Sequence, residues 1–193
     1  FDEYCFGNVI GKSGKEPHLV LKEEKSEIYV GGTGAVARHL SSFVKNIKLV
    51  APFGNENYLK KILLNNFPSN INTNFVKPYK EFSSILKKRF IDIASNYKMF
   101  GSYKLPQKLN KNLSKNLYTK ITKNLKGADL IIVCDYGHNF LDENLTNFIS
   151  KNNKFVALNT QLNSGSRGFN ALDKYKNINA LIINETELRQ QTN

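Results

Sequence analysis

The stretch VGGTGAVARHL, residues 30–40, combines three glycines with the point where a predicted strand gives way to a helix. It follows a β-rich approach, EIYV, and its glycines lead into an apolar run that is compatible with a helix. Glycine costs about 0.5–1 kcal/mol relative to alanine inside a regular element, so something must offset that loss. The gains that suit a strand-to-helix turn are a positive φ, a close approach of the backbone to a ligand, and backbone N–H groups at a helix start.

The sequence around this stretch alternates between two kinds of segment. An apolar spacing of three to four residues predicts helices around 59–63 and 141–149, and a Lys/Asn/Leu-rich stretch predicts a third over 107–126. Short apolar runs rich in β-branched residues predict buried strands. These runs cover residues 47–53, 129–135, 155–160 and 180–184. Strands that alternate with helices predict an α/β fold with right-handed βαβ units and a mainly parallel sheet.

Two further segments, residues 4–30 and 82–104, break this alternation because they lack helical periodicity. They contain YCFGNVI, HLVL and EIYV in the first case, and FSSILKKRFIDIA and YKMFGSYKL in the second. Such runs predict antiparallel strands that project from the α/β body. We expect them to form a small lid.

Composition limits the class of protein. A chain of 193 residues with 40% hydrophobic content can bury the core of one domain, with or without an appendage. The net charge of +12 would suit a nucleic acid or an anionic small molecule. Lysine and asparagine are spread through the whole chain, however, which favours a biased composition over a binding face. We therefore do not expect a nucleic-acid partner.

The cysteines and the hydropathy of the sequence indicate where in the cell the protein works. Cys5 and Cys134 lie far apart, and no CxxC pattern accompanies them. This argues against a zinc site or a disulfide framework and favours reducing conditions. No apolar run approaches the ~18 residues of a membrane span, and no signal peptide is visible. We expect a cytoplasmic protein without a membrane partner.

Polar residues follow three of the predicted strands. CDYGHN ends the strand at 129–135, NTQLNSGSRGFN follows the one at 155–160, and NETE follows the one at 180–184. Ligands of open parallel sheets bind outside the carboxyl ends of the strands, so these residues could share one site. Loops at strand ends are often polar for no functional reason, which leaves a structural alternative for each. The glycine stretch at 31–34 matches neither GxGxxG nor GxxxxGK[ST].

The order of several motifs is more specific than any one of them. In sequence order, FDEYCFG, VGGTGAVA, KLVAPFGNE, ADLIIVCDYGHNFL and INETELR resemble the PfkB family of ribokinase-like carbohydrate kinases, and within it the heptose-phosphate kinase branch. The resemblance covers essentially all 193 residues. It implies a ribokinase-like three-layer α/β/α fold with a small β lid. It also implies phosphoryl transfer from ATP, with Mg²⁺, to a hydroxyl of a sugar or sugar phosphate.

The resemblance assigns roles on the sugar side of the site. The acid near the first strand would bind sugar hydroxyls, the paired glycines would let the backbone close on the sugar, and the strand-tip pair would lie near the phosphate acceptor. Arg89 is similar to a basic residue near the lid that could pair with a sugar phosphate, although an ordinary surface arginine is an equal alternative. The implied substrate-binding residues are Asp2, Gly31, Gly32, Thr33, Arg89, Asp135 and Tyr136.

The resemblance also assigns roles on the nucleotide side. An N-x-x-E element would act on magnesium and phosphate largely through water, because Mg²⁺ usually keeps several waters. The implied residues for nucleotide and Mg²⁺-phosphate are Asn159, Gln161, Asn184 and Glu187. No residue is expected to ligate the metal directly.

The chain departs from the family pattern at three places. Ala35 stands where the family usually has an asparagine that contacts the sugar, and Asn159-Thr160-Gln161 replaces the D-P-K of the heptose-kinase branch. The G-A-G-D turn that carries the catalytic aspartate does not occur. We expect that base, and most of the ATP-binding part, to follow Asn193, so that residues 1–193 are an incomplete kinase domain that is inactive alone. Residues 159–175 resemble a subgroup fused to a nucleotidyltransferase.

Other interpretations remain open at this level. The chain could be a non-catalytic sugar- or nucleotide-binding or regulatory domain of the same fold, or a basic nucleic-acid-binding domain in which LKKRF and the aromatic residues at 97–103 contact a single strand. Three histidines have no metal-binding spacing, and His138 alone lies beside the predicted site. Pairing of two lids would bury open strand edges, so we expect a homodimer through the lid.

Overall fold

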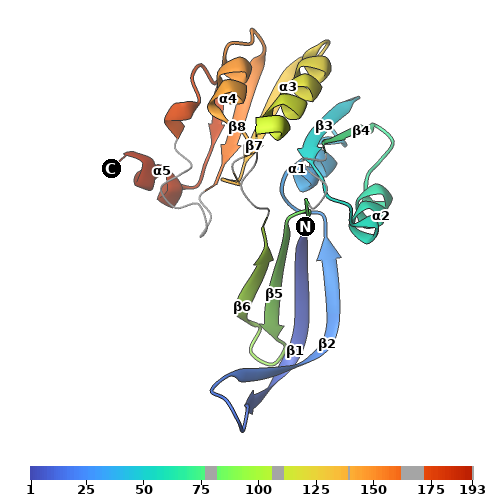
Figure 1. Cartoon of the computed structure of the whole chain (residues 1–193), viewed down its shortest axis with the longest axis vertical. Coiled ribbons are helices and arrows are strands. Elements are labelled where there is room, and N and C mark those ends of the chain that lie inside the picture. The colour runs from blue at the N-terminus through green and yellow to red at the C-terminus, as the bar shows by residue number, and fades with distance from the viewer. Residues whose placement is uncertain (77–81, 106–110, 139, 162–171, 193) are drawn as a thin grey trace.

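The computed structural model describes residues 1–76, 82–105, 111–138, 140–161 and 172–192. Helices and strands form a body, and a long sheet projects from it (Figure 1). The chain starts where the two parts meet, so the first strand runs outward from the body (Figure 1).

The projecting sheet, called the lid from here on, has the strand order β2-β1-β5-β6. Its strands are β1 (Asp2–Lys12), β2 (Leu19–Tyr29), β5 (Leu86–Asp92) and β6 (Tyr97–Lys104). The expectation of antiparallel strands is correct within each hairpin but wrong for the central pair, because β1 and β5 are parallel. Both hairpins leave the body on their first strand, and those two strands lie side by side.

The strands of the body are parallel and form two hydrogen-bonded groups. One group is β3 (Ile47–Pro52) with β4 (Ile71–Val76), and the other is β7 (Leu130–Asp135), β8 (Phe155–Thr160) and β9 (Ala180–Ile182). The parallel sheet predicted from sequence is therefore confirmed, with β4 as a strand that was not predicted. The segment of β4, INTNFV, is short and has three consecutive polar residues at its centre, so a search for apolar runs did not find it.

Five helices and a short 3₁₀ turn, η1, complete the described part of the chain. They are α1 (Gly32–Leu40), α2 (Asn57–Asn66), α3 (Lys111–Leu125), α4 (Glu143–Ser150), η1 (Leu172–Lys174) and α5 (Glu185–Thr192). All three predicted helices are present, and residues 107–110 of the third lie outside the described residues.

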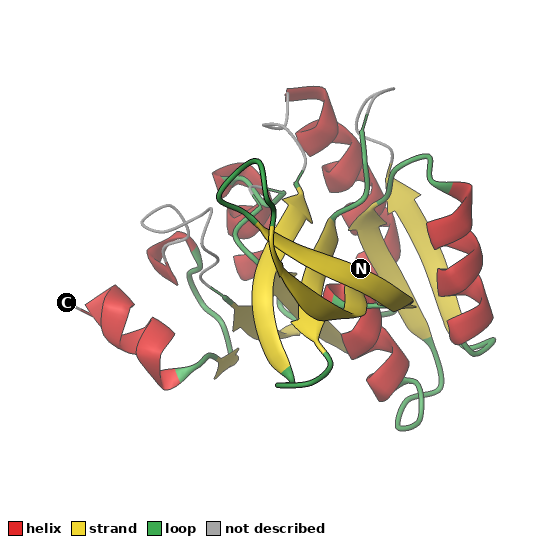
Figure 2. Cartoon of the chain, turned by 90° about the horizontal axis from the view of Figure 1, so that it is seen from below, coloured by secondary structure: helices red, strands yellow, loops and turns green. Residues whose placement is uncertain are grey.

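Helices cover both faces of the body strands. Successive residues of a strand point to opposite faces. On β3, Leu49 packs with Ala37 of α1, whereas the next residue, Val50, packs with Leu117 of α3. A second core joins β7 and β8 to α4 through Val133, Leu158 and Ile149. This arrangement is the predicted three-layer α/β/α body, and Figure 2 shows it from below, with the lid in front.

In the described part of the chain, no helix is long and apolar enough to span a membrane.

Candidate functional site

The base of the lid carries an ion pair between its two inner strands. Asp2 of β1 and Arg89 of β5 meet with 2.6 Å between Oδ1 and Nη1, and both side chains are more than two-thirds buried. The Arg89 guanidinium lies 5.4 Å from the centre of the Tyr4 ring. In the parallel register Tyr4 is opposite Arg89, so the arginine packs on its cross-strand neighbour and reaches Asp2 two residue pairs back toward the body. Two residues expected at the sugar are thus brought together.

Lys87 lies on the same face of β5, because it is two residues before Arg89 and directly opposite Asp2. Burial lowers the pKa of Lys87, and the charge of Asp2 opposes this effect. The ammonium is also 5.8 Å from the centre of the Tyr103 ring. The base of the lid therefore holds two cations and one carboxylate on one face. The sequence prediction missed Lys87, although its spacing from Arg89 in the strand LKKRF indicates a shared face.

The paired glycines explain why the backbone is bare at residues 31–32. A Cβ on Gly31 would overlap Oδ2 of Asp2. Gly32 has φ +55°, a conformation that L side chains rarely adopt, and a Cβ there would lie 3.3 Å from the Tyr136 ring. The two glycines let the acid of the lid and the tyrosine that follows β7 approach the start of α1. The positive φ of Gly32 is one of the gains expected for these glycines. A close approach was expected of a ligand, whereas the structure shows Asp2 and Tyr136 of the protein itself in that position.

Thr33 is linked to Tyr136 through the thiol of Cys134. The side chains of Thr33 and Tyr136 hydrogen-bond to Cys134 of β7, while burial raises the pKa of the thiol. Burial also raises the pKa of Tyr136, so its hydroxyl stays protonated at neutral pH. The start of α1, the end of β7 and the base of the lid consequently share one neighbourhood.

His138 lies next to the same neighbourhood. Burial is the main cause that lowers the pKa of His138 to about 4, and the charge of Lys87 adds to it while that of Asp135 opposes it. The imidazole is therefore neutral at neutral pH, able to accept one hydrogen bond and donate another.

Asp135, at the end of β7, is held by contacts with residues of the body. Its Oδ1 accepts a hydrogen bond from the Gly137 N–H at 3.0 Å, and its Oδ2 accepts one from the Tyr175 hydroxyl at 2.8 Å and lies 2.5 Å from Lys174 Nζ. The carboxylate is 4% exposed. It therefore connects the end of β7 to the last residue of η1 and to the residue that follows it. Nothing in the sequence pattern pointed to Lys174 or Tyr175, which approach Asp135 from 40 residues away.

The predicted nucleotide residues lie at the ends of β8 and β9. Asn159 donates from Nδ2 to the carbonyl of Ile182 at 3.0 Å, and the Gln161 N–H donates to the carbonyl of Asp135 at 3.1 Å. Asn184 and Glu187 cap α5: Oδ1 of Asn184 accepts from the Thr186 N–H at 2.8 Å, and Oε2 of Glu187 accepts from the Asn184 N–H at 3.2 Å. This reciprocal pattern is a capping box.

The described residues contain no group of three or more His, Cys, Asp or Glu side chains that could hold a metal ion. The described part of the site offers hydroxyl and carboxylate groups for hydrogen bonds and cations for an anion. Residues 162–171, which belong to the stretch that resembles the nucleotidyltransferase-fused subgroup, lie outside the described residues.

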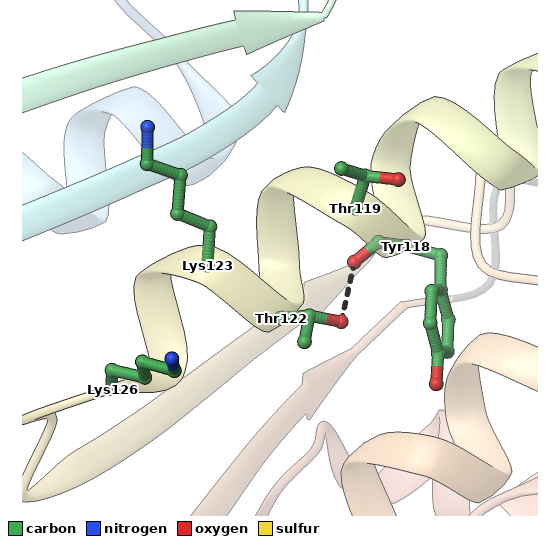
Figure 3. Close-up of a pocket in the computed structure, with 5 residues that line it drawn as sticks. All are labelled: Tyr118, Thr119, Thr122, Lys123 and Lys126. Atoms are coloured by element: carbon green, nitrogen blue, oxygen red, sulfur yellow. Dashed lines mark hydrogen bonds between the residues drawn. The ribbon is translucent and has the colours of Figure 1, made fainter.

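A hollow of about 360 Å³ lies elsewhere, on the outer side of α3 (Figure 3). It is lined by Tyr118, Thr119, Thr122, Lys123 and Lys126. The Thr122 hydroxyl donates to the Tyr118 carbonyl within the helix, as threonine often does in helices (Figure 3). None of the predicted site residues lines this hollow.

Comparisons with known proteins agree with this geometry. No family model matches the chain. Phosphofructokinase-2 from Escherichia coli in complex with fructose-6-phosphate matches with a TM-score of 0.69 and 19% identity over 99% of this chain and 60% of that one. A ribokinase from Thermotoga maritima matches with a TM-score of 0.62 and 15% identity over 97% of this chain and 57% of that one. The fold is ribokinase-like.

Curated relatives point the same way. The bifunctional protein HldE of Helicobacter pylori strain G27 is 30% identical over 149 residues, which are 77% of this chain and 32% of the relative. HldE of Campylobacter curvus is 24% identical over 193 residues, covering 99% of this chain and 40% of the relative. The chain thus spans less than half the length of these relatives. These matches confirm the predicted resemblance to the PfkB carbohydrate kinases and their heptose-kinase branch.

Proposed function

We propose that this ribokinase-like chain is the substrate-binding part of an ATP-dependent kinase that phosphorylates a sugar or a sugar phosphate. The observation that carries the proposal is the meeting of Asp2 and Arg89 at the base of the lid, beside Gly31, Gly32 and Tyr136. Residues from four separated segments of the chain gather there. Such a convergence under a lid suits a small polar substrate that must be shielded from water.

The charges at the base of the lid favour a sugar phosphate within this class. A carboxylate such as Asp2 accepts hydrogen bonds from sugar hydroxyls, and a guanidinium such as Arg89 binds phosphate oxygens in a fork geometry. Lys87 places a second cation on the same face of β5. Two cations against one carboxylate leave a positive balance that a phosphate group would neutralise.

For the nucleotide, we propose that Asn159, Gln161, Asn184 and Glu187 face the phosphates of ATP. Glu187 would act on Mg²⁺ through water, which suits a cation that keeps several of its waters. The catalytic base, an aspartate at a helix start, would come from residues after Asn193. A fusion to a nucleotidyltransferase belongs to the same proposal, because the curated relatives are called bifunctional and are longer than this chain.

The experiment uses the full-length protein and measures ADP release from ATP over a panel of sugars and sugar phosphates, fructose 6-phosphate included. Replacement of Arg89 by Gln should raise the KM for the accepted sugar phosphate about 10–100-fold and leave the KM for ATP unchanged, since a charge-assisted hydrogen bond is lost at one site only. Lys98→Gln, on the exposed strand β6, serves as the matched control. A folded protein that transfers phosphate to no member of the panel would refute the proposal.

A non-catalytic sugar-binding or regulatory domain is the second candidate. Ala35 favours it, because alanine cannot make the sugar hydrogen bond that the family's asparagine makes. Calorimetry would then show tight binding of a sugar phosphate with no turnover in the presence of ATP. Turnover at a measurable rate would eliminate this candidate.

We also propose a homodimer through the lid. A hollow of about 320 Å³ on this sheet is lined mostly by apolar side chains of its strands, among them Val20, Leu21, Phe90, Met99 and Phe100. The Phe100 ring stacks on Phe90 at 4.4 Å between centroids yet stays 57% exposed. A second copy of the chain could bury this exposed apolar surface in a symmetric dimer.

A further inference from the structure

Glu56 contacts the lid hairpin β5–β6 at both places where it joins the body. It directly precedes α2, and its side chain is 14% exposed. Its two carboxylate oxygens accept from the Ser84 N–H at 3.2 and 3.3 Å, and Oε2 also accepts from the Ser84 hydroxyl at 3.1 Å. Oε1 lies 3.5 Å from Nζ of Lys104. Ser84 comes two residues before β5, and Lys104 is the last residue of β6.

Gly54 makes room for this contact. Its N–H donates to Oγ of Ser84 at 2.9 Å. A Cβ on Gly54 would overlap Oε2 of Glu56, lie 2.6 Å from the Ser84 nitrogen and 2.8 Å from the Phe82 carbonyl oxygen. The segment 82–84 is therefore pressed against the turn between β3 and α2, and Ser84 is 4% exposed.

The carboxylate is charged when it makes these contacts. Burial raises the pKa of Glu56, but hydrogen bonds from backbone N–H groups and from the Ser84 hydroxyl, with the charge of Lys104, outweigh it and hold the pKa below its ordinary value. Charge-assisted hydrogen bonds are roughly twice as strong as neutral ones. One anion thus holds both ends of a hairpin.

The distance from Ser84 to Arg89 along the chain means that a small change in the angle of the hairpin moves Arg89 appreciably. Arg89 is five residues beyond Ser84, which is about 16 Å at the ~3.3 Å rise of a strand. A rotation of ~10° at Ser84 would therefore move Arg89 by about 3 Å, by the same strand rise. Because β5 is paired with β1 from Asp2–Lys87 to Gly7–Asp92, β1 moves with it, and the displacement of Arg89 is relative to the body that carries the paired glycines.

We propose that Glu56 is a positioning residue that fixes the angle of the β5–β6 hairpin on the body and thereby holds Arg89 over the paired glycines. The contacts of Glu56 with Ser84 and Lys104 support its effect on the hairpin angle. The effect on substrate binding rests on the proposed function. Glu56 itself lies in the turn before α2 and acts on the site through the hairpin.

The first experiment is hydrogen exchange on the full-length protein without any substrate. Glu56→Ala should speed exchange about tenfold in peptides from β5 and β6 and leave peptides from β7, β8 and α4 unchanged. Glu24→Ala is the matched control, because Glu24 is an exposed lid residue whose ion pair is with Lys22 of its own strand β2, at 3.2 Å. Unchanged exchange in β5 and β6, or an equal increase everywhere, would overturn the proposal.

Two milder variants keep the test decisive if Glu56→Ala does not fold. Glu56→Gln keeps oxygen and shape but loses the charge, and Lys104→Gln removes the partner on β6 alone. Both should speed exchange in β6 by a smaller factor than Glu56→Ala. If either variant folds and exchanges like the wild type in β6, the double contact has no positioning role.

A kinetic measurement then separates this inference from the proposed function. In an active full-length protein, Glu56→Gln should raise the KM for the sugar phosphate and leave kcat and the KM for ATP within about twofold. A fall in kcat with an unchanged KM would contradict a positioning role. If the protein has no kinase activity, the proposed function fails, whereas the exchange result still decides the role of Glu56.

Discussion

At the scale of single residues, the site depends on close approaches that only glycine permits. Gly31 has φ −108°, which any residue can adopt, so backbone strain does not require a glycine there. The requirement comes from Oδ2 of Asp2, which occupies the position of a Cβ. Gly31 is therefore needed for contact with the lid.

Replacement of Gly31 by Ala tests this explanation. The new methyl group should displace Asp2 from Arg89 and lower the free energy of unfolding by about 1–3 kcal/mol, the usual cost of overpacking. Chemical denaturation measures the change. Gly14→Ala is the control, since no atom lies within 4 Å of its Cβ position, and it should change the stability little. Equal effects of the two substitutions would show that Asp2 does not limit position 31.

His138 gives a second prediction at this scale, in the pH dependence of stability. Its folded pKa of about 4 lies below the ordinary 6.5. The unfolded chain then binds the proton first as pH falls, so the stability that neutral His138 contributes is complete above pH 6.5 and is lost between 6.5 and 4. His138→Gln should flatten the stability profile in that window. Parallel profiles for the two proteins would contradict the burial of a neutral imidazole.

Sequence patterns located some of these residues and not others. Asp2 and Gly31 belong to motifs with a fixed order, so they could be named before their contact was known. Lys174 and Tyr175 could not, because they contact Asp135 across about 40 residues of chain, and neither hydrophobic periodicity nor a local motif indicates such a long-range contact. The roles predicted for Asp135 and Glu187 at the ligand stay predictions, and the structure adds the internal contacts that each makes.

At the scale of elements, the presence of helices was more predictable than the pairing of strands. The apolar stripe around Leu145 and Ile149 predicted α4, and Asp142 caps it by accepting the Leu145 N–H at 2.9 Å. The parallel pairing of β1 with β5 could not be predicted. It depends on which of two remote hairpins lies beside the other, and neither hairpin encodes that choice locally.

The cap of α4 can be tested with two substitutions at one position. Asp142→Ala removes the acceptor for the Leu145 N–H and should lower the free energy of unfolding by about 1 kcal/mol. Asp142→Asn keeps an acceptor oxygen and should cost much less. Thermal or chemical denaturation compares the variants. If the Asn variant is as unstable as the Ala variant, the charge of Asp142 matters more than its hydrogen bond.

At the scale of the whole molecule, the lid sheet presents an apolar surface that the body does not cover. The proposed dimer would bury this surface. Phe100→Asp places a charge in it and should shift the full-length protein from dimer to monomer in sedimentation at micromolar concentration, with at least a tenfold weaker association. Phe43→Asp is the control, because Phe43 lies on the body and is 84% exposed. A wild type that sediments only as a monomer would refute the dimer.

The parallel pairing of β1 with β5 affects how the lid can fold during synthesis on the ribosome. Asp2 pairs with Lys87, so the hairpin that emerges first must wait for a partner more than 80 residues downstream. At translation rates of about 5–20 residues per second, the chain between Tyr29 and Asp92 takes roughly 3–12 s to synthesise. During that time the β1 edge is unpaired and open to neighbouring nascent chains.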